Sequence, residues 1–236
     1  MILDNKFVGT AVFVIVAIVL AAAFGFYFAT VTVAHGSSTT SVSTTTSTVT
    51  STTTASSNAT GSPYVLTLVI STNNIYNSTF GDQPAYYVLG SHGLESSANI
   101  SLPAHKLIKL VIVNYDDGGA NLTSPQYEAV TGTVNNVVTE VNNNNINSSQ
   151  GLSGIQIIGG QNVSSVSPDN IAHTFTIPQI GLNIPIEPSS TVSAYFTLNQ
   201  TGTFTWFCMT ECGAGATGIL GAMATAGWMT GSVTIS

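Results

Sequence analysis

Charged residues are scarce in this chain. Asp, Glu, Lys and Arg make up 6% of its 236 residues, and arginine does not occur at all. Proteins that bind nucleic acid present clusters of Lys and Arg, so the composition excludes a nucleic-acid partner. The simplest interpretation is a surface built from Ser, Thr and Asn. A second interpretation is a domain that faces a strongly acidic medium, where carboxylates are neutral and an excess of Lys or Arg would only repel itself.

Patterns typical of catalytic sites are missing as well. No serine, histidine and acid form a grouping with the spacing of a nucleophile elbow. The carboxylates are scattered singly, apart from Asp116 and Asp117 in a glycine-rich turn. The sequence therefore predicts no catalytic residue, and any link to an enzyme would be that of a non-catalytic subunit.

One segment is long, apolar and free of charge. Residues 7–34 read FVGTAVFVIVAIVLAAAFGFYFATVTVA. This run exceeds the roughly 20 residues that a helix needs to cross a bilayer, and also the apolar region of about 7–15 residues in a cleaved signal peptide. We therefore expect a retained anchor over residues 1–35. Because Lys6 precedes the run and basic residues stay on the cytoplasmic side, we expect a single-pass cell-membrane protein whose C-terminal part is extracellular.

The next stretch, residues 36–62, is almost entirely Ser and Thr. Such a tract has nothing to bury that could offset the entropy of ordering, so we expect a flexible stalk that leads to a domain over residues 63–236. Seven N-x-S/T sequons follow the apolar run, which is typical of an extracytoplasmic glycoprotein. They begin at Asn58, Asn77, Asn99, Asn121, Asn147, Asn162 and Asn199.

From Tyr64 onward, β-rich runs alternate with Gly, Pro, Asn and Ser, and no run has the pattern of an amphipathic helix. This arrangement predicts an all-β, antiparallel sandwich or barrel. The expected strands are Tyr64–Ser71, Ala85–Leu89, Lys106–Tyr115, Gly154–Gly160, His173–Ile180, Thr191–Leu198, Gly202–Cys208 and Gly231–Ile235. The stretch at about 116–170 is expected to be a long polar insertion with one hairpin that turns at Asn135–Asn136.

Soft metal ligands are concentrated near the C-terminus. The chain has two cysteines, Cys208 and Cys212, and His173 opens an earlier strand-like run. Three of the four methionines surround the cysteines in sequence: Met209, Met223 and Met229. Thiolate and thioether sulfur select copper over hard cations, and copper electron-transfer domains combine His, Cys and Met ligands. The sequence therefore predicts a copper site.

From His173 to its end the chain resembles the cupredoxin domain of subunit II of haem-copper terminal oxidases, in the form with a single N-terminal membrane helix. A ligand His opens a strand, an NIPI strand and turn follow, and GTFTWFCMTECG matches the cysteine motif of that family. The layout of anchor, stalk and sandwich is also similar to that of archaeal sulfocyanin. The resemblance implies a Greek-key cupredoxin-like sandwich that transfers electrons in an archaeal respiratory chain. Its partner would be the catalytic subunit of a terminal oxidase or another redox protein.

In that family two copper ions share two thiolates, and two imidazoles, a Met sulfur and a backbone carbonyl complete the centre. The resemblance implies Cys208 and Cys212 as thiolates and His173 as the first imidazole. It also implies Met229 as the Met ligand and places Glu211 in the stretch of the carbonyl ligand, one residue later than in the family.

The chain departs from the family at the second imidazole. That position holds Ala216, in a loop longer than usual, so one ligand His is missing and Met223 is the candidate replacement. The other histidines are expected to lie at the surface: His35, His92 and His105.

Two other interpretations stay open. Cysteine pairs outside the cell usually form disulfides, and Cys208 and Cys212 are close enough in sequence to do so. The domain would then be a copper-free structural subunit of a quinol-oxidising terminal oxidase. The third interpretation is a copper-carrying or surface-layer glycoprotein. Met209 is expected to fill space, and Trp206 and Trp228 are expected to pack in the core.

Overall fold

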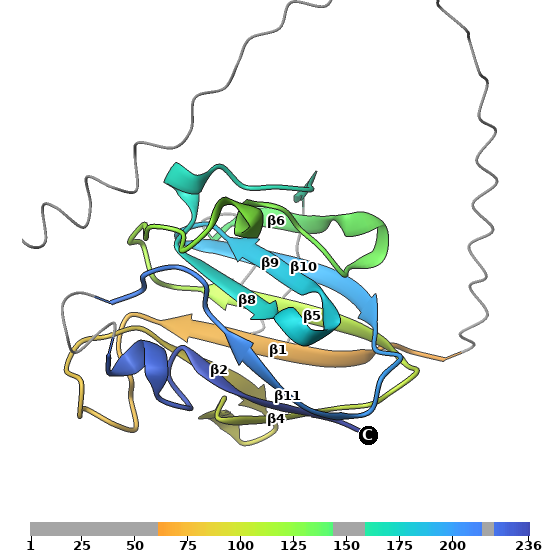
Figure 1. Ribbon diagram of the computed structural model, residues 1–236, viewed down its shortest axis with the longest axis horizontal. Coiled ribbons are helices and arrows are strands. Elements are labelled where there is room, and N and C mark those ends of the chain that lie inside the picture. The colour runs from red at the N-terminus through yellow and green to blue at the C-terminus, as the bar shows by residue number, and fades with distance from the viewer. Residues whose placement is uncertain (1–60, 144–158, 214–219) are drawn as a thin grey trace, which may run out of the picture. The chain divides into compact units, whose positions relative to one another are not determined.

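The computed structural model of the chain describes residues 61–143, 159–213 and 220–236. These residues form two β-sheets with short 3-10 turns between the strands (Figure 1). The predicted all-β class is thereby confirmed, and the sheets are consistent with a cupredoxin-like sandwich. The predicted anchor and nearly all of the stalk lie outside the described residues. Within the described ranges, no helix is both long and apolar enough to cross a membrane.

The first sheet has seven strands. In spatial order they are β3 (Gly93–Ser96), β2 (Ala85–Gly90), β1 (Tyr64–Ser71), β5 (Leu107–Asn114), β10 (Ser190–Thr197), β6 (Val138–Asn142) and β7 (Gln161–Val163). Neighbours pair antiparallel except β1 and β5, which are parallel. Because parallel strands cannot be joined by a tight turn, the chain between β1 and β5 passes through both sheets.

The second sheet has five strands and carries the residues of most interest. Their order is β4 (Asn99–Leu102), β12 (Thr230–Ile235), β11 (Gly202–Phe207), β8 (His173–Ile177) and β9 (Leu182–Ile186). Here β4 and β12 are the parallel pair. Five 3-10 turns are described: η1 (Pro125–Glu128), η2 (Val134–Asn136), η5 (Pro168–Asn170), η6 (Pro178–Ile180) and η7 (Ala222–Ala224).

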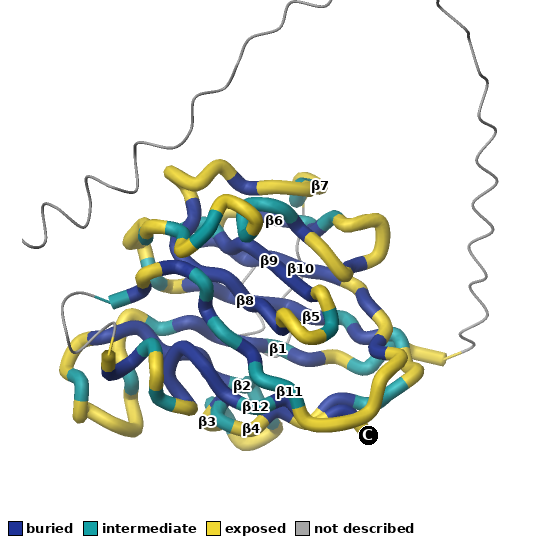
Figure 2. Tube along the Cα trace, viewed as in Figure 1, coloured by how far each residue is buried: buried dark blue, intermediate teal, exposed yellow. Residues whose placement is uncertain are grey.

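Buried stretches occur in strands of both sheets (Figure 2), and their apolar side chains form the main core cluster, while Trp228 belongs to a smaller second cluster. Trp206 on β11 is fully buried, and its indole Nε1 donates a hydrogen bond to the Ser97 carbonyl at 3.1 Å. A Cβ on Gly231, the neighbour of Trp206 on β12, would lie 2.5 Å from that indole nitrogen. Glycine at 231 therefore makes room for the indole. Trp228 is also buried, so both tryptophans pack in the interior as predicted.

The stretch at 116–170 contributes strands to the first sheet. The predicted turn is present, since Asn135 and Asn136 have φ of 60° and 51°. The hairpin predicted around that turn is not formed, because β6 pairs with β10 and β7 instead of with the residues before the turn. Val138 and Val141 on β6 are buried, which favours its place beside β10. The predicted strand Gly154–Gly160 lies mostly outside the described residues.

Sequon asparagines in the described ranges are all exposed, as a glycan would require. These are Asn77, Asn99, Asn121, Asn162 and Asn199. Asn58 and Asn147 lie outside the described residues. Glycosylation itself stays a prediction.

Glu140 on β6 is a buried carboxylate that should favour folding at acid pH. Burial raises its pKa, a hydrogen bond with Ser190 opposes this, and the Glu187 carboxylate raises the pKa further. A carboxyl group whose pKa is higher in the folded than in the unfolded state favours folding below its unfolded pKa. That contribution is lost as the pH rises through the folded pKa.

Replacing Glu140 by glutamine is therefore expected to raise the thermal unfolding midpoint at pH 7 and to change it little at pH 3. The reason is that glutamine keeps the shape of the protonated acid and cannot ionise. Asp82→Asn, at an exposed acid, is the control and should show no such pH-dependent gain. A Glu140→Gln protein that is less stable than the wild type at pH 7 would contradict this account.

Candidate metal centre

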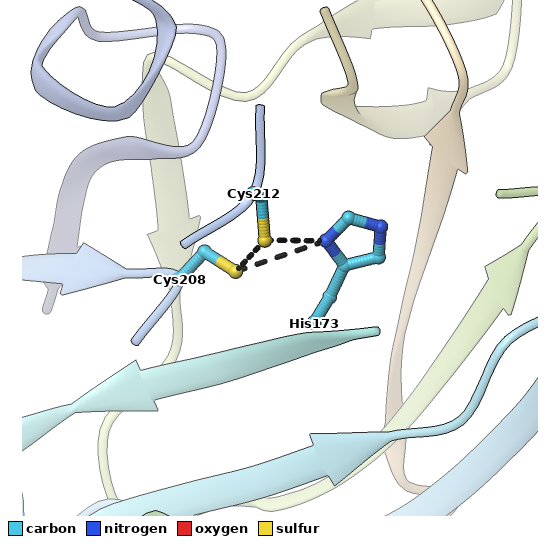
Figure 3. A group of neighbouring side chains, drawn as sticks. All are labelled: His173, Cys208 and Cys212. Atoms are coloured by element: carbon cyan, nitrogen blue, oxygen red, sulfur yellow. Dashed lines mark hydrogen bonds between the residues drawn. The ribbon is translucent and has the colours of Figure 1, made fainter. Parts of the chain in front are cut away.

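His173, Cys208 and Cys212 form a compact buried cluster at one end of the second sheet (Figure 3). His173 is the first residue of β8, and Cys208 follows the last residue of β11. The imidazole Nδ1 lies 2.8 Å from the Cys212 Sγ and 3.8 Å from the Cys208 Sγ. The two Sγ atoms are 2.9 Å apart. All three side chains are at most 4% exposed.

Strand pairing brings these residues together. Phe207, at the end of β11, pairs with Thr176 of β8, so Cys208 enters the loop beside the start of β8. The Cys208 N–H donates to the Met229 carbonyl at 2.8 Å, which ties the loop to the start of β12. The Thr174 N–H points to the Cys208 Sγ at 3.4 Å. The position of the first thiol is therefore set by backbone on both sides.

A second segment, Asn121–Thr123, holds the cysteine loop from outside. Leu122 and Thr210 form an isolated antiparallel bridge. The Glu211 N–H donates to the Asn121 carbonyl at 2.8 Å, and the Thr123 hydroxyl donates to the Met209 carbonyl at 2.8 Å. The loop between the cysteines is thus paired along its length, which limits how far the two sulfur atoms can separate.

Asp116 completes the cluster on the far side of the imidazole. Its Oδ2 lies 3.0 Å from the His173 Nε2. When Nε2–H donates to this carboxylate, Nδ1 is left to face the two sulfur atoms. Metal-binding histidines usually donate their other N–H to a carboxylate or carbonyl, which fixes the ring and raises its basicity. Asp116 was not predicted as a site residue. The only signal for it was its position just after the strand predicted at 106–115.

The electrostatics of the cluster favour a protonated imidazolium, with a proton on each ring nitrogen, and one negative charge on the sulfur pair. Burial alone would lower the pKa of His173, but its hydrogen bonds to Asp116 and Cys208 raise it to about 9. Burial raises the pKa of Cys212 well above its ordinary value, and the neighbouring Cys208 adds to this. For Cys208 the effect of burial is outweighed by hydrogen bonds from Cys212 and His173, which lower its pKa. A metal that binds here would replace the protons on Nδ1 and Cys212.

The disulfide alternative is not the state seen in this structure. Both cysteines are free thiols, and their 2.9 Å separation exceeds the S–S bond length of about 2.05 Å. The pair is nevertheless close enough that oxidation would need only a small movement.

The remaining predicted site residues differ in how deeply they are buried and in whether they pack near the two cysteines. Met229 is fully buried in the same core cluster as both cysteines, and Met223 on η7 is half-buried against that cluster. Glu211 is exposed, and its side chain is outside the cluster. Met209 is half-buried in the loop. Ala216 lies outside the described residues.

A nucleophilic role for this cluster is disfavoured by burial. Cys212, His173 and Asp116 have the order of a thiol, base and carboxylate grouping. Such a thiol must meet its substrate, yet Cys212 is 2% exposed and His173 is 1% exposed. None of the four described surface cavities is lined by these residues. The donor set itself, two thiols and one imidazole, is the kind that selects soft metal ions such as copper.

Comparisons with known proteins give likenesses to solved structures only. No protein family model and no curated protein sequence matches the chain. Among solved structures, the chain is similar to the periplasmic domain of subunit II of cytochrome oxidase of Bradyrhizobium japonicum, with 12% identity, 73% of this chain and 83% of that chain covered, and a TM-score of 0.32. Auracyanin B is 14% identical, with 75% of this chain and 91% of that chain covered and a TM-score of 0.33. Rusticyanin from Thiobacillus ferrooxidans is 12% identical, with 74% of this chain and 79% of that chain covered and a TM-score of 0.29.

At such TM-scores the likenesses carry no argument, so the assignment rests on the chain's own features. The two sheets and the clustering of His173, Cys208 and Cys212 agree with the resemblance to a cupredoxin domain that lacks one ligand histidine. These residues fit a copper site: two thiol sulfurs and one oriented imidazole nitrogen converge, away from water, within 4.8 Å of one another.

Asp116 offers a direct test of how the imidazole is held. Asp116→Ala is expected to weaken copper binding by about 10–100-fold, the usual cost of losing an outer hydrogen-bond partner of a metal ligand. Asp116→Asn should lose less, because an amide oxygen can still accept the Nε2–H. Competition with a copper chelator measures both affinities, and Asp117→Ala at the adjacent exposed acid is the control. Equal affinities for wild type and Asp116→Ala would show that the contact does not orient the ligand.

Proposed function

We propose that the described domain binds copper through His173, Cys208 and Cys212 and serves in one-electron transfer. The observation that carries this proposal is the buried convergence of one imidazole nitrogen and two sulfur atoms, with the second imidazole nitrogen held by Asp116. Copper bound there would supply the one-electron redox step. The protein's part is to bind the ion and to keep the site in one geometry.

The frame around the site supports that part. The Cys208 N–H donates to the carbonyl of Met229, just before β12, and the Cys208 Sγ accepts from the Thr174 N–H of β8. The loop after Cys208 is held by the segment 121–123. A site held in place by paired backbone keeps nearly the same geometry when the ion gains or loses an electron. This lowers the reorganisation energy of electron transfer. Met229, buried in the same core cluster, is the further sulfur that the resemblance implies as a ligand. More sulfur and less imidazole favour Cu(I) and a higher reduction potential.

The cellular setting is proposed from the sequence. Residues 7–34 would anchor the chain in the cell membrane, and residues 36–62 would carry the domain outside it. Within a respiratory chain the domain would act like oxidase subunit II, with the catalytic subunit or another redox protein as partner. Protease added to intact cells should then release a fragment that begins within residues 36–62. Release only after lysis would refute this orientation.

One alternative keeps the fold and drops the metal. Ala216 stands where the family resemblance places the second ligand His, and loss of a ligand is what a copper-free structural subunit would show. In that protein Cys208 and Cys212 would be oxidised to a disulfide.

Copper loading of the full chain in detergent separates the two functions. We expect the reduced, anaerobically loaded protein to retain copper and, after oxidation, to show visible absorption from thiolate-to-copper charge transfer. Free thiols are counted before reduction. Failure to retain copper, together with no free thiol in the protein as isolated, would replace electron transfer by the structural role.

A further inference from the structure

The number of copper ions can be argued from the donor atoms. Nδ1 of His173 and the two Sγ atoms form a triangle with sides of 2.8, 2.9 and 3.8 Å. The three donor atoms lie close enough together for one ion to contact all of them, since metal bonds in zinc sites measure about 2.0 Å to imidazole nitrogen and about 2.3 Å to thiolate sulfur. The cluster as it stands therefore has room for one ion that binds all three atoms.

A second ion bridged by the same sulfur atoms would need a nitrogen of its own, and strand register places the other described histidines far away. The Tyr86 N–H donates to the Trp228 carbonyl, so the start of β2 lies at the metal end of the sandwich. His92 follows the opposite end of β2. Met229 precedes the start of β12, and Ser236 follows its other end. The Ala104 N–H donates to the Ser236 carbonyl, so His105 lies at the end of the sandwich opposite the metal cluster.

The residues outside the described ranges offer little more. Residues 144–158 and 214–219 contain no His, Cys or Met. The one further histidine, His35, precedes the Ser/Thr tract. A second imidazole would therefore have to come from His35 or from another protein.

Besides the His173 Nδ1, a hydroxyl oxygen also contacts both sulfur atoms. The Thr210 Oγ1 is fully buried and lies 3.1 Å from the Cys208 Sγ and 2.6 Å from the Cys212 Sγ. It also contacts the Ala172 carbonyl, at 2.9 Å, as a donor. A neutral hydroxyl is a hard, weak ligand for copper. The place beside both sulfur atoms is thus taken by a group that cannot substitute for an imidazole.

We infer that this site holds a single copper ion per chain, bound by His173, Cys208 and Cys212, and not the two-copper centre of the resembling family. The inference rests on the proposed function, since it assumes that the site binds copper. With two thiolates and one imidazole on one ion, the donor set favours Cu(I).

Metal stoichiometry tests the inference apart from electron transfer. The full chain in detergent is reduced and titrated anaerobically with Cu(I) against a competing chelator, and bound copper is measured by elemental analysis and native mass spectrometry. We expect saturation at one equivalent. After oxidation, the electron paramagnetic resonance spectrum should show hyperfine splitting from a single copper nucleus. His35→Ala and His92→Ala are the controls and should both leave one equivalent bound.

The possible failures are distinguishable. Two equivalents in the wild type, or splitting from two equivalent nuclei, would overturn the single-ion inference and leave the copper function standing. A drop in bound copper in His35→Ala would show that a second imidazole comes from the N-terminal part. No bound copper at all would overturn the proposed function, and the inference with it.

Discussion

His173→Ala is expected to abolish the visible colour of the oxidised, copper-loaded protein and to reduce copper affinity by several orders of magnitude. This imidazole is the only one in the described cluster, so its loss leaves two thiols without a nitrogen donor. Copper bound by the two thiols alone would be held as Cu(I), which has no charge-transfer colour of the oxidised type. Chelator competition and absorption spectra measure the two effects.

Three further variants show whether the loss is specific to the metal site. Cys208→Ser should shift and weaken the absorption band, because only the Cys212 thiolate is left to supply the charge transfer. Met223→Leu should change the absorption band or the reduction potential only if its sulfur replaces the missing histidine. His105→Ala at the opposite end of the sandwich should leave colour and affinity unchanged. A His173→Ala protein that keeps both would refute the assigned ligand set.

Trp206→Ala is expected to lower the free energy of unfolding by about 3–5 kcal/mol, the usual cost of truncating a large aromatic side chain in a core. The indole is fully buried, packs edge-on to Tyr86 at 5.0 Å between ring centroids, and contacts the Phe175 ring at 5.6 Å. For a domain of this size the thermal midpoint should fall by roughly 6–20 °C. Chemical denaturation of the apo protein measures the free energy.

A milder variant keeps this prediction measurable if the alanine protein does not fold. Trp206→Phe retains a ring but removes the hydrogen bond to the Ser97 carbonyl, and it should cost about 1–3 kcal/mol. Tyr195→Ala, at a side chain that is 40% exposed, should change stability by only about 0.5 kcal/mol. If Trp206→Ala costs no more than this control, the indole is not a central core residue.

The longer strands could be predicted from the sequence because their own residues determine them. β1 has the predicted bounds, Tyr64–Ser71, and β2, β5, β10, β11 and β12 differ by one residue at either end at most. The run predicted over 173–180 ends as a strand at Ile177, since Pro178 begins a 3-10 turn and cannot donate to a ladder. β3, β4 and β7 were not predicted. They are only three or four residues long, and their extended shape comes from the strands they pair with.

The three residues of the cluster could be selected from the sequence by their chemistry, and their surroundings could not. Cys208, Cys212 and His173 belong to residue types that bind soft metals, so their types and order were enough. Asp116 is an ordinary turn residue in sequence, and its role arises from a contact across 57 positions. Thr210 was missed for a similar reason, because a threonine between two cysteines has no distinctive pattern. Only the fold shows that its hydroxyl touches both sulfur atoms.

The residues of the site come from distant parts of the chain, and this bears on whether copper binds before or after folding. His173 contacts Asp116 across 57 positions and Cys212 across 39, and β4 pairs with β12 through residues 133 positions apart. β-sandwiches dominated by such distant pairings typically fold in milliseconds to seconds. Small zinc modules are unfolded without their metal, but here apolar side chains from both sheets form a large core, and its burial supplies stability that does not depend on the metal site. We therefore expect copper to join a chain that has already folded and to play no part in nucleating it.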